Sequence, residues 1–249
     1  MRLKIFNRYE LKYLLTRVQY ELLVSELKSY MEPDEEGDEH GSYSITSLYY
    51  DTDDHKAYWD KVEGHKYRRK VRIRVYDDQA VSPETDCFLE IKQRLDKTLQ
   101  KRRVSLPYSS AEALCGAGEP ITVASETDQA VISEVRYLHD VLQLQPTCIV
   151  SYRRLAFNGS EYDPGLRVTF DTNLKDRTHA LTLLSAGQAE NHYFIPPEWC
   201  IMEVKVNYRV PYWLTEVIGR YHCPLRRISK YCAALEQSKA LLQTQRIFY

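Results

Sequence analysis

One segment of the sequence, KYRRKVRIRVYDD at Lys66 to Asp78, alternates basic and apolar side chains, and it limits the fold more than any other feature. Successive side chains of a β-strand point to opposite faces, so Val71, Ile73 and Val75 would share one apolar face. The other face would then carry Lys66, Arg68, Lys70, Arg72 and Arg74. The whole chain has a net charge of −1, so this positive charge is local, and the composition excludes a generally basic nucleic-acid-binding protein.

Similar alternation predicts eight strands along the 249 residues. They are expected at Arg8–Leu15, Ser42–Asp51, Lys66–Asp77, Cys87–Arg94, Leu99–Leu106, Thr147–Phe157, Leu166–Leu174 and Cys200–Asn207. Apolar residues at helical spacing predict four helices. These are one that Thr16 caps, one near Asp128–Leu142, and two around Tyr212–Tyr221 and Tyr231–Gln243. The segments Glu32–Gly41 and Leu114–Thr127 are expected to be loops.

The first predicted helix would place five apolar side chains on one face, Val18, Leu22, Leu23, Leu27 and Tyr30. No linker divides the chain convincingly, so we expect one domain over residues 1–249.

Several classes of site have no support in the sequence. The six cysteines include no CxxC pair and the seven histidines no HxxxH spacing, so neither a zinc site nor a disulfide framework is expected. The sequence contains no GxxxxGK[ST] loop and no GxGxxG motif, so the usual backbone cradle for a nucleotide is missing. No apolar run approaches the roughly 20 residues that span a bilayer. We therefore expect a cytoplasmic protein with reduced cysteines, and peripheral attachment to a membrane stays open.

The polar faces of the predicted strands repeat one arrangement. Glu10 with Lys12, Glu90 with Lys92 and Glu203 with Lys205 each place a carboxylate and an ammonium on one face. Any one of these pairs is typical of a solvated antiparallel sheet. Together they favour an α+β fold in which an antiparallel β-barrel encloses a polar, cationic lumen and helices cover the outside. Such a lumen would bind a polyanion with several phosphates, and its glutamates could hold a divalent metal.

An ordered set of motifs carries a resemblance to a known family. The motifs are NRYELKYLL, SLYYDT, YRRKVRIRVY, FLEIKQR, KRRVSL, SYRRLAF, LRVTFDTNL, MEVKV and ISKY, between Arg8 and about Ala234. This set resembles the catalytic domain of the vacuolar transporter chaperone (VTC) family, polyphosphate polymerases of the triphosphate tunnel metalloenzyme (CYTH-like) superfamily. The resemblance implies an antiparallel β-tunnel that binds ATP and inorganic polyphosphate or triphosphate. It also implies Mg²⁺ or Mn²⁺ as cofactor, and transfer of the γ-phosphate of ATP to the growing chain.

The resemblance also implies roles for particular residues. The residues that would act in catalysis are Arg72, Arg74, Lys92, Arg154 and Lys230. Those expected to bind phosphate or ATP are Lys12, Lys101, Tyr152 and Ser229, and Arg103 and Lys205 join them because they share the same strand faces. The expected metal ligand is Glu203, with Glu10, Glu90 and Asp171 as second-rank candidates on the same faces. Ser229 could also be the N-cap of the last helix, and Glu203 could simply pair with Lys205 or an arginine.

Two other functions stay open at this stage. One is hydrolysis of inorganic triphosphate or nucleoside triphosphates on the same fold, with water as the acceptor. The other is a non-catalytic module that binds polyphosphate and is recognised by salt-sensitive binding without turnover. Phosphoryl transfer depends mainly on positioning and charge stabilisation, so no covalent nucleophile is required. The sequence predicts no nucleic-acid partner, and it leaves open a separate membrane partner, the oligomeric state, the primer and the preferred metal.

Overall fold

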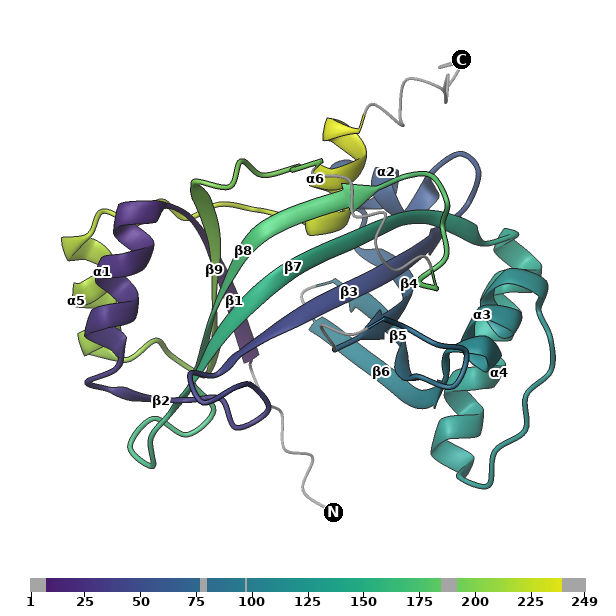
Figure 1. The fold of residues 1–249 in the computed structure, drawn as a ribbon, viewed down its shortest axis with the longest axis horizontal. Coiled ribbons are helices and arrows are strands. Elements are labelled where there is room, and N and C mark those ends of the chain that lie inside the picture. Colours follow the sequence, from purple (N-terminus) through teal and green to yellow (C-terminus); the bar gives the residue numbers. More distant parts are fainter. Residues whose placement is uncertain (1–7, 77–79, 97, 185–191, 239–249) are drawn as a thin grey trace. The chain divides into compact units, whose positions relative to one another are not determined.

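A computed structural model describes residues 8–76, 80–96, 98–184 and 192–238 of the chain (Figure 1). These residues form nine strands and six helices, which confirms the α+β class with an antiparallel sheet. The strands are β1 (Arg8–Thr16), β2 (Met31–Pro33), β3 (Ser42–Asp51), β4 (Tyr67–Val75), β5 (Asp86–Leu95), β6 (Thr98–Pro107), β7 (Gln145–Gly159), β8 (Arg167–Arg177) and β9 (Trp199–Asn207). The helices are α1 (Arg17–Leu27), α2 (Lys56–Val62), α3 (Tyr108–Ala117), α4 (Glu126–Leu142), α5 (Tyr212–Arg220) and α6 (Lys230–Gln237).

The strands are hydrogen-bonded in the order β1-β9-β8-β7-β3-β4-β5-β6, and β2 pairs with β7. Within the described residues this path has two ends, β1 and β6, and no ladder joins them. Within the same residues, no helix combines the length and the apolar character that crossing a membrane requires. All six cysteines are free in the structure.

All eight predicted strands and all four predicted helices are confirmed, with ends that differ by a few residues. The last residue of the predicted strand Lys66–Asp77 and the end of the predicted helix Tyr231–Gln243 lie outside the described residues. The short elements β2, α2 and α3 were not predicted. The loop expected at Leu114–Thr127 is wrong at both ends, because α3 continues to Ala117 and ends at Gly118, which has a φ of +67°, and α4 begins at Glu126. The loop expected at Glu32–Gly41 is wrong in its first two residues, which belong to β2.

The chain divides into two compact units, each built from three separate segments. Unit 1 comprises Met1–Ser44, Tyr152–Leu174 and Ile195–Ile228, and unit 2 comprises Ile45–Ser151, Lys175–Phe194 and Ser229–Tyr249. Because β3, β7 and β8 contribute residues to both units, neither unit is a contiguous stretch of sequence.

In unit 1, helices α1 and α5 lie beside the sheet (Figure 1). Their buried side chains pack with the apolar face of the sheet. Leu23 and Leu27 of α1 are fully buried against residues such as Phe170 of β8. The predicted apolar face of α1 is therefore partly wrong, because Val18 and Leu22 are exposed, as is Tyr30 beyond the helix. Tyr20 and Val24 pack against the core with Leu23 and Leu27, at the i, i+3, i+4, i+7 spacing of one helical face. Thr16 caps α1, and Gln19 completes a capping box.

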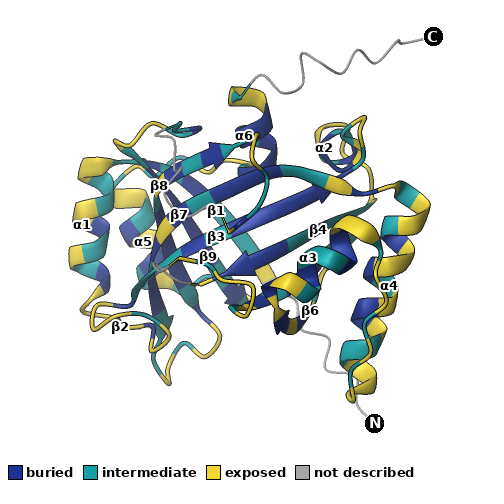
Figure 2. Cartoon of the chain, turned by 45° about the vertical axis from the view of Figure 1, so that its right-hand side comes forward, coloured by how far each residue is buried: buried dark blue, intermediate teal, exposed yellow. Residues whose placement is uncertain are grey.

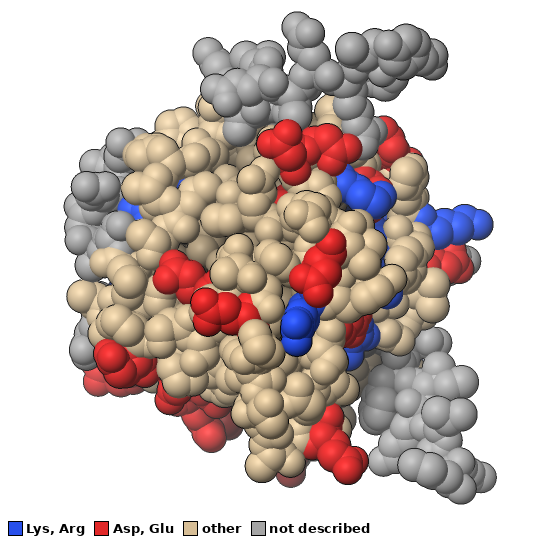
Figure 3. All heavy atoms as spheres, turned by 90° about the vertical axis from the view of Figure 1, so that its right-hand side faces the viewer, with Lys and Arg blue, Asp and Glu red and all other residues tan. Residues whose placement is uncertain are grey.

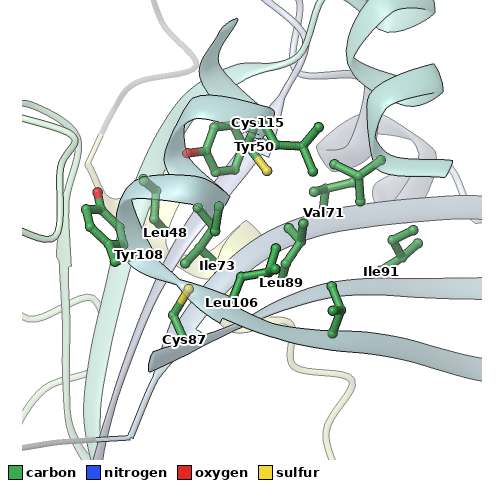
Figure 4. Packing of buried hydrophobic residues seen from close by; sticks show 14 of the residues in the cluster. Leu48, Tyr50, Val71, Ile73, Cys87, Leu89, Ile91, Leu106, Tyr108 and Cys115 are labelled. Atoms are coloured by element: carbon green, nitrogen blue, oxygen red, sulfur yellow. The ribbon is translucent and has the colours of Figure 1, made fainter. Parts of the chain in front are cut away.

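In unit 2, the apolar face of β3, β4, β5 and β6 packs under α3 and α4. Figure 4 shows Leu48, Ile73 and Leu89 of this face beside Tyr108 and Cys115 of α3. In Figure 2, the burial colours show that α4 has one buried side and one exposed side. Each fully buried leucine or isoleucine of such a core contributes about 1.5–3 kcal/mol.

The outer side of unit 2 carries acidic charge. The segment from Tyr108 to Leu142 contains six acidic residues and only one basic residue, Arg136. Seen from the side of α3 and α4, acidic groups outweigh basic ones on the surface (Figure 3). Arg69 of β4 and Arg102 of β6 pair with Glu134 of this acidic cover, at 3.7 and 2.7 Å, whereas Arg72 and Arg74 lie on the other face of the sheet.

Candidate functional site

Most of the predicted site residues lie on the polar faces of the strands, opposite the two apolar cores, and Ser229 and Lys230 lie at the N-terminus of α6. We call those of unit 1 the unit 1 site: Glu10, Lys12, Tyr152, Arg154, Asp171, Glu203 and Lys205. We call those of unit 2 the unit 2 site: Arg72, Arg74, Glu90, Lys92, Lys101, Arg103, Ser229 and Lys230. Strand parity alone accounts for the strand residues of each site, because alternate residues of a strand share a face.

In the unit 1 site, strand register places opposite charges side by side. Lys12 of β1 lies opposite Glu203 of β9, and Glu10 lies opposite Lys205. The ammonium of Lys12 is 3.2 Å from a carboxylate oxygen of Glu10 and 3.4 Å from one of Glu203. It also donates to the carbonyl oxygen of Ile228 at 3.1 Å. Lys205 lies 3.6 Å from Glu203, so the pairing that the sequence left open for Glu203 is present.

A buried ion pair anchors the same site. The guanidinium of Arg154 donates two hydrogen bonds to the carboxylate of Asp171, at 2.7 Å from Nε and 2.8 Å from Nη2, and lies 3.6 Å from Glu203. Arg154 is 7% exposed and Asp171 is fully buried. Burial alone would lower the pKa of Arg154, but the charge of Asp171 outweighs it and raises that pKa well above its usual value. Arg154 is thus a permanent cation whose position is set by Asp171.

Thr169 is a member of this site that sequence reasoning did not select. It lies opposite Glu203 in the β8–β9 ladder and is 1% exposed. Within the described residues, its hydroxyl oxygen has no hydrogen-bond partner. A buried hydroxyl without a hydrogen-bond partner lowers the stability of the fold. A ligand that forms a hydrogen bond with Thr169 would remove this cost. Its parity with Asp171 was the only signal in the sequence.

The unit 1 site offers hard oxygen donors for a divalent cation. In the part of the chain that the structure describes, no three His, Cys, Asp or Glu side chains lie together as a metal cage. Glu203 and Glu10 nevertheless share the contact with Lys12, and the Thr169 hydroxyl lies across from Glu203. Mg²⁺ is usually held by one or two carboxylates together with phosphate oxygens and waters. The residues present therefore fit a metal that is completed by a phosphorylated ligand.

In the unit 2 site, one buried carboxylate organises the cations. Glu90 is fully buried and accepts hydrogen bonds from Arg72, at 2.7 Å from Nε and 2.5 Å from Nη2, and from Lys101 at 3.2 Å. Burial opposes its ionisation, but the charges of Arg72, Arg74 and Lys101 lower the pKa of Glu90 to about 2. Glu90 is therefore ionised at neutral pH and holds Arg72 and Lys101 in place.

Three lysines line up across neighbouring strands of this site. Lys70 of β4 lies opposite Lys92 of β5, and Lys92 lies opposite Lys101 of β6. Like charges directly opposite each other repel, and in this row Lys101 is also paired with Glu90 at 3.2 Å. Lys70 was not selected from the sequence, although it shares the parity of Arg72 and Arg74.

The N-terminus of α6 lies beside the lysine row. Ser229 is the N-cap of α6, as expected, and its hydroxyl is 3.3 Å from the ammonium of Lys70. Lys230, the first residue of the helix, is 8% exposed. A helix N-terminus favours a nearby anion, so it adds to the positive potential of the row.

The arginines at the other end of the unit 2 site contact aromatic rings. Arg74 is 6% exposed and donates from Nε to the hydroxyl of Ser47 at 3.0 Å. Its guanidinium lies 5.6 Å from the ring centre of Tyr76. Burial would raise the pKa of Tyr76, but the charge of Arg74 outweighs it and lowers that pKa. The guanidinium of Arg103 lies 4.3 Å from the ring centre of Phe88.

Each unit thus brings its own predicted residues together on one polar face. The catalytic, phosphate-binding and metal-binding roles of these residues stay predictions.

Comparison with known proteins gives one family and a fold. The sequence model of the VTC domain matches residues 7–239. A putative adenylyl cyclase from Hippeastrum, whose structure is described as revealing a dominant triphosphatase activity, has a TM-score of 0.50. It is 13% identical, and the similarity covers 92% of this chain and 94% of that chain. A putative adenylate cyclase from Bacillus halodurans has a TM-score of 0.51 at 15% identity, over 88% of this chain and 92% of that chain. No curated protein matches the sequence.

Proposed function

Because the chain belongs to the VTC domain family, we propose that it is a metal-dependent polyphosphate polymerase that moves the γ-phosphate of ATP onto a growing inorganic polyphosphate chain. The lysine row is the observation that carries this proposal. Lys70, Lys92 and Lys101 lie opposite one another, with Arg72 in the adjacent row. Cations gathered in this way on one face suit a polyanion with several phosphates, whose oxygens can contact several of them at once.

The proposed reaction needs little covalent chemistry from the protein. Arg72, Arg74 and Lys92 would bind phosphate oxygens and stabilise the charge that spreads over them in the transition state. Glu90 would hold Arg72 and Lys101 before the substrate arrives, because its contacts exist in the free protein. Preorganised charges of this kind cost no rearrangement at the moment of reaction.

The unit 1 site would hold the divalent metal and further phosphate. Glu203, Glu10 and the Thr169 hydroxyl are the proposed metal ligands, and Mg²⁺ or Mn²⁺ would neutralise negative charge on the phosphate oxygens. Arg154 would bind phosphate from a fixed position, because Asp171 accepts hydrogen bonds from two of the three nitrogens of its guanidinium, Nε and Nη2.

Hydrolysis of a triphosphate is the second candidate function. The similar Hippeastrum structure is described as having a dominant triphosphatase activity, and in that reaction water would replace the polyphosphate acceptor. The same cations and metal would serve both reactions, so only the products distinguish them.

The products formed from ATP test the proposal. The purified chain of 249 residues is incubated with ATP and Mg²⁺ or Mn²⁺, and the products are separated by size. We expect ADP together with phosphate chains, and no turnover after a chelator is added. Free phosphate without chains would indicate a triphosphatase instead of a polymerase. Binding of polyphosphate without any turnover would indicate a non-catalytic module.

A single substitution separates loss of function from loss of fold. We expect Lys92→Met to lower the turnover rate at least about 100-fold, the usual effect of removing one charge that stabilises a transition state. Because Lys92 lies between two other lysines, its removal relieves repulsion, and denaturant unfolding of the variant measures whether the fold is retained. Lys28→Met is the matched control, since Lys28 is exposed after α1, outside both sites.

A further inference from the structure

We propose that Tyr76, Phe88 and Arg103 form a platform on which the base of a nucleoside triphosphate stacks, so that the chain prefers nucleoside triphosphates to inorganic triphosphate. We call these three residues the aromatic platform. This inference rests on the proposed function and deepens it, because it assigns a binding site to the base, the part of a nucleoside triphosphate that inorganic triphosphate lacks.

Phe88 occupies an unexpected position in the sheet. It shares the parity of Glu90 and Lys92, so it lies on the charged face of β5, while Cys87, Leu89 and Ile91 form the apolar face. Its neighbours across the ladders are Arg74 and Ser105. Phe88 is only partly buried there and belongs to neither apolar core. Core packing therefore does not explain an aromatic side chain on this face.

The geometry of the platform is that of a stacking surface. The rings of Tyr76 and Phe88 meet edge to face, with centres 5.7 Å apart and planes at 79°. The guanidinium of Arg103 lies 4.3 Å from the centre of the Phe88 ring. Tyr76 is 38% exposed, and Arg103 is also exposed. Within the described residues, Arg103 forms neither a hydrogen bond nor an ion pair, so its planar group can receive a second ring.

The chemistry of these groups identifies the ligand. Nucleobases stack on aromatic rings and on arginine guanidinium planes. An inorganic phosphate chain has no flat face and gains nothing from a phenyl ring. Stacking tolerates every base, because each base presents a π-face, so the expected ligand class is nucleoside triphosphates in general.

The position of the platform relative to the cations suits such a ligand. Along the strands of unit 2, the row of Arg74 and Phe88 is followed by the row of Arg72, Glu90 and Arg103, and then by the lysine row. Alternate residues of a strand are about 7 Å apart, so Phe88 is about 14 Å from the lysine row. An extended nucleoside triphosphate could thus place its base on the platform and its phosphates on the arginines and lysines.

Binding measurements on two ligands test the inference. The dissociation constants of a non-hydrolysable ATP analogue and of inorganic tripolyphosphate are measured by calorimetry with Mg²⁺, for the 249-residue chain and its variants. We expect Phe88→Leu to weaken binding of the ATP analogue about 5- to 150-fold, the usual effect of losing one stacking ring. Tripolyphosphate binding should stay within about twofold of the wild type, because every phosphate-binding cation is retained.

A second variant avoids any loss of folding. Arg103→Lys keeps the charge at an exposed position but removes the planar group, so it should also weaken the ATP analogue selectively. Tyr162→Leu is the matched control, since Tyr162 is 85% exposed in a loop of unit 1 and should leave both constants unchanged.

The outcomes separate this inference from the proposed function. If the wild type binds both ligands and neither variant changes the ratio of the two dissociation constants, the proposed platform is wrong and the proposed function stands. If a variant weakens the binding of both ligands equally, Phe88 and Arg103 have a structural role, and the proposed platform is also wrong. If the wild type binds neither ligand, the proposed function itself fails.

Discussion

Glu90 gives the sharpest test of how the unit 2 site is organised. Its carboxylate is fully buried between Arg72 and Lys101, and its pKa is about 2 in place of the usual 4.5. This difference corresponds to about 3 kcal/mol of stability at neutral pH. The variant Glu90→Gln keeps the shape of the side chain and removes its charge, so its free energy of unfolding at pH 7 should be about 3 kcal/mol lower.

The effect of Glu90→Gln should depend on pH in a defined direction. A carboxylate whose pKa is lowered by folding stabilises the protein above about pH 4.5, and this contribution is lost as the pH falls towards about 2. At pH 3 about 1.5 kcal/mol should remain, so the wild type and the variant should approach each other in stability. Urea unfolding at pH 7, 5, 4 and 3, followed by circular dichroism, measures this convergence.

Glu21→Gln is the control for the Glu90 experiment. Glu21 pairs with Arg17 at 2.7 Å on the surface of α1, where its side chain is 58% exposed, so its loss should cost less than about 1 kcal/mol. A stability difference for Glu90→Gln that is absent at pH 7, or that stays constant down to pH 3, would refute the view that this carboxylate holds the cations electrostatically.

Two further predictions concern the unit 1 site. Arg154→Met should lower the free energy of unfolding by about 3–5 kcal/mol, because it leaves the carboxylate of Asp171 buried without its partner; denaturant titration measures it, and a loss under about 1 kcal/mol would contradict a buried pair. Thr169→Val should leave stability unchanged or raise it by about 1 kcal/mol without ligand, since it removes a buried hydroxyl that has no partner within the described residues. A clear loss of stability in the metal-free protein would contradict that prediction, while weaker Mn²⁺ binding in the presence of tripolyphosphate would support its proposed role as a ligand.

Much of the site follows from the sequence because strand parity is a local property. Alternation along Lys66–Asp78 is sufficient to place Arg72 and Arg74 on one face and Ile73 on the other. The same reasoning assigns Lys12, Glu203 and Arg154 to polar faces. Motif order added the family, which no single strand could indicate.

The sequence did not predict helix α3 or the buried face of α1 correctly, and the reason lies in the local sequence of each helix. Helix α3 buries Tyr108, Ala111, Leu114 and Cys115 at helical spacing, but its small and polar residues resemble a loop. In α1, a set of five apolar residues allowed more than one face, and contact with the sheet selected the one that contains Leu23 and Leu27.

Which side chains meet across the strands was decided only by the tertiary structure. Register between paired strands aligns Lys70, Lys92 and Lys101, and it sets Thr169 opposite Glu203. Parity assigns a face to each residue but not its neighbours, because those depend on how far one strand is shifted against the next. The sequence by itself therefore determined the charge of each face. The tertiary structure decided which charged side chains are paired and which residues lie opposite Phe88.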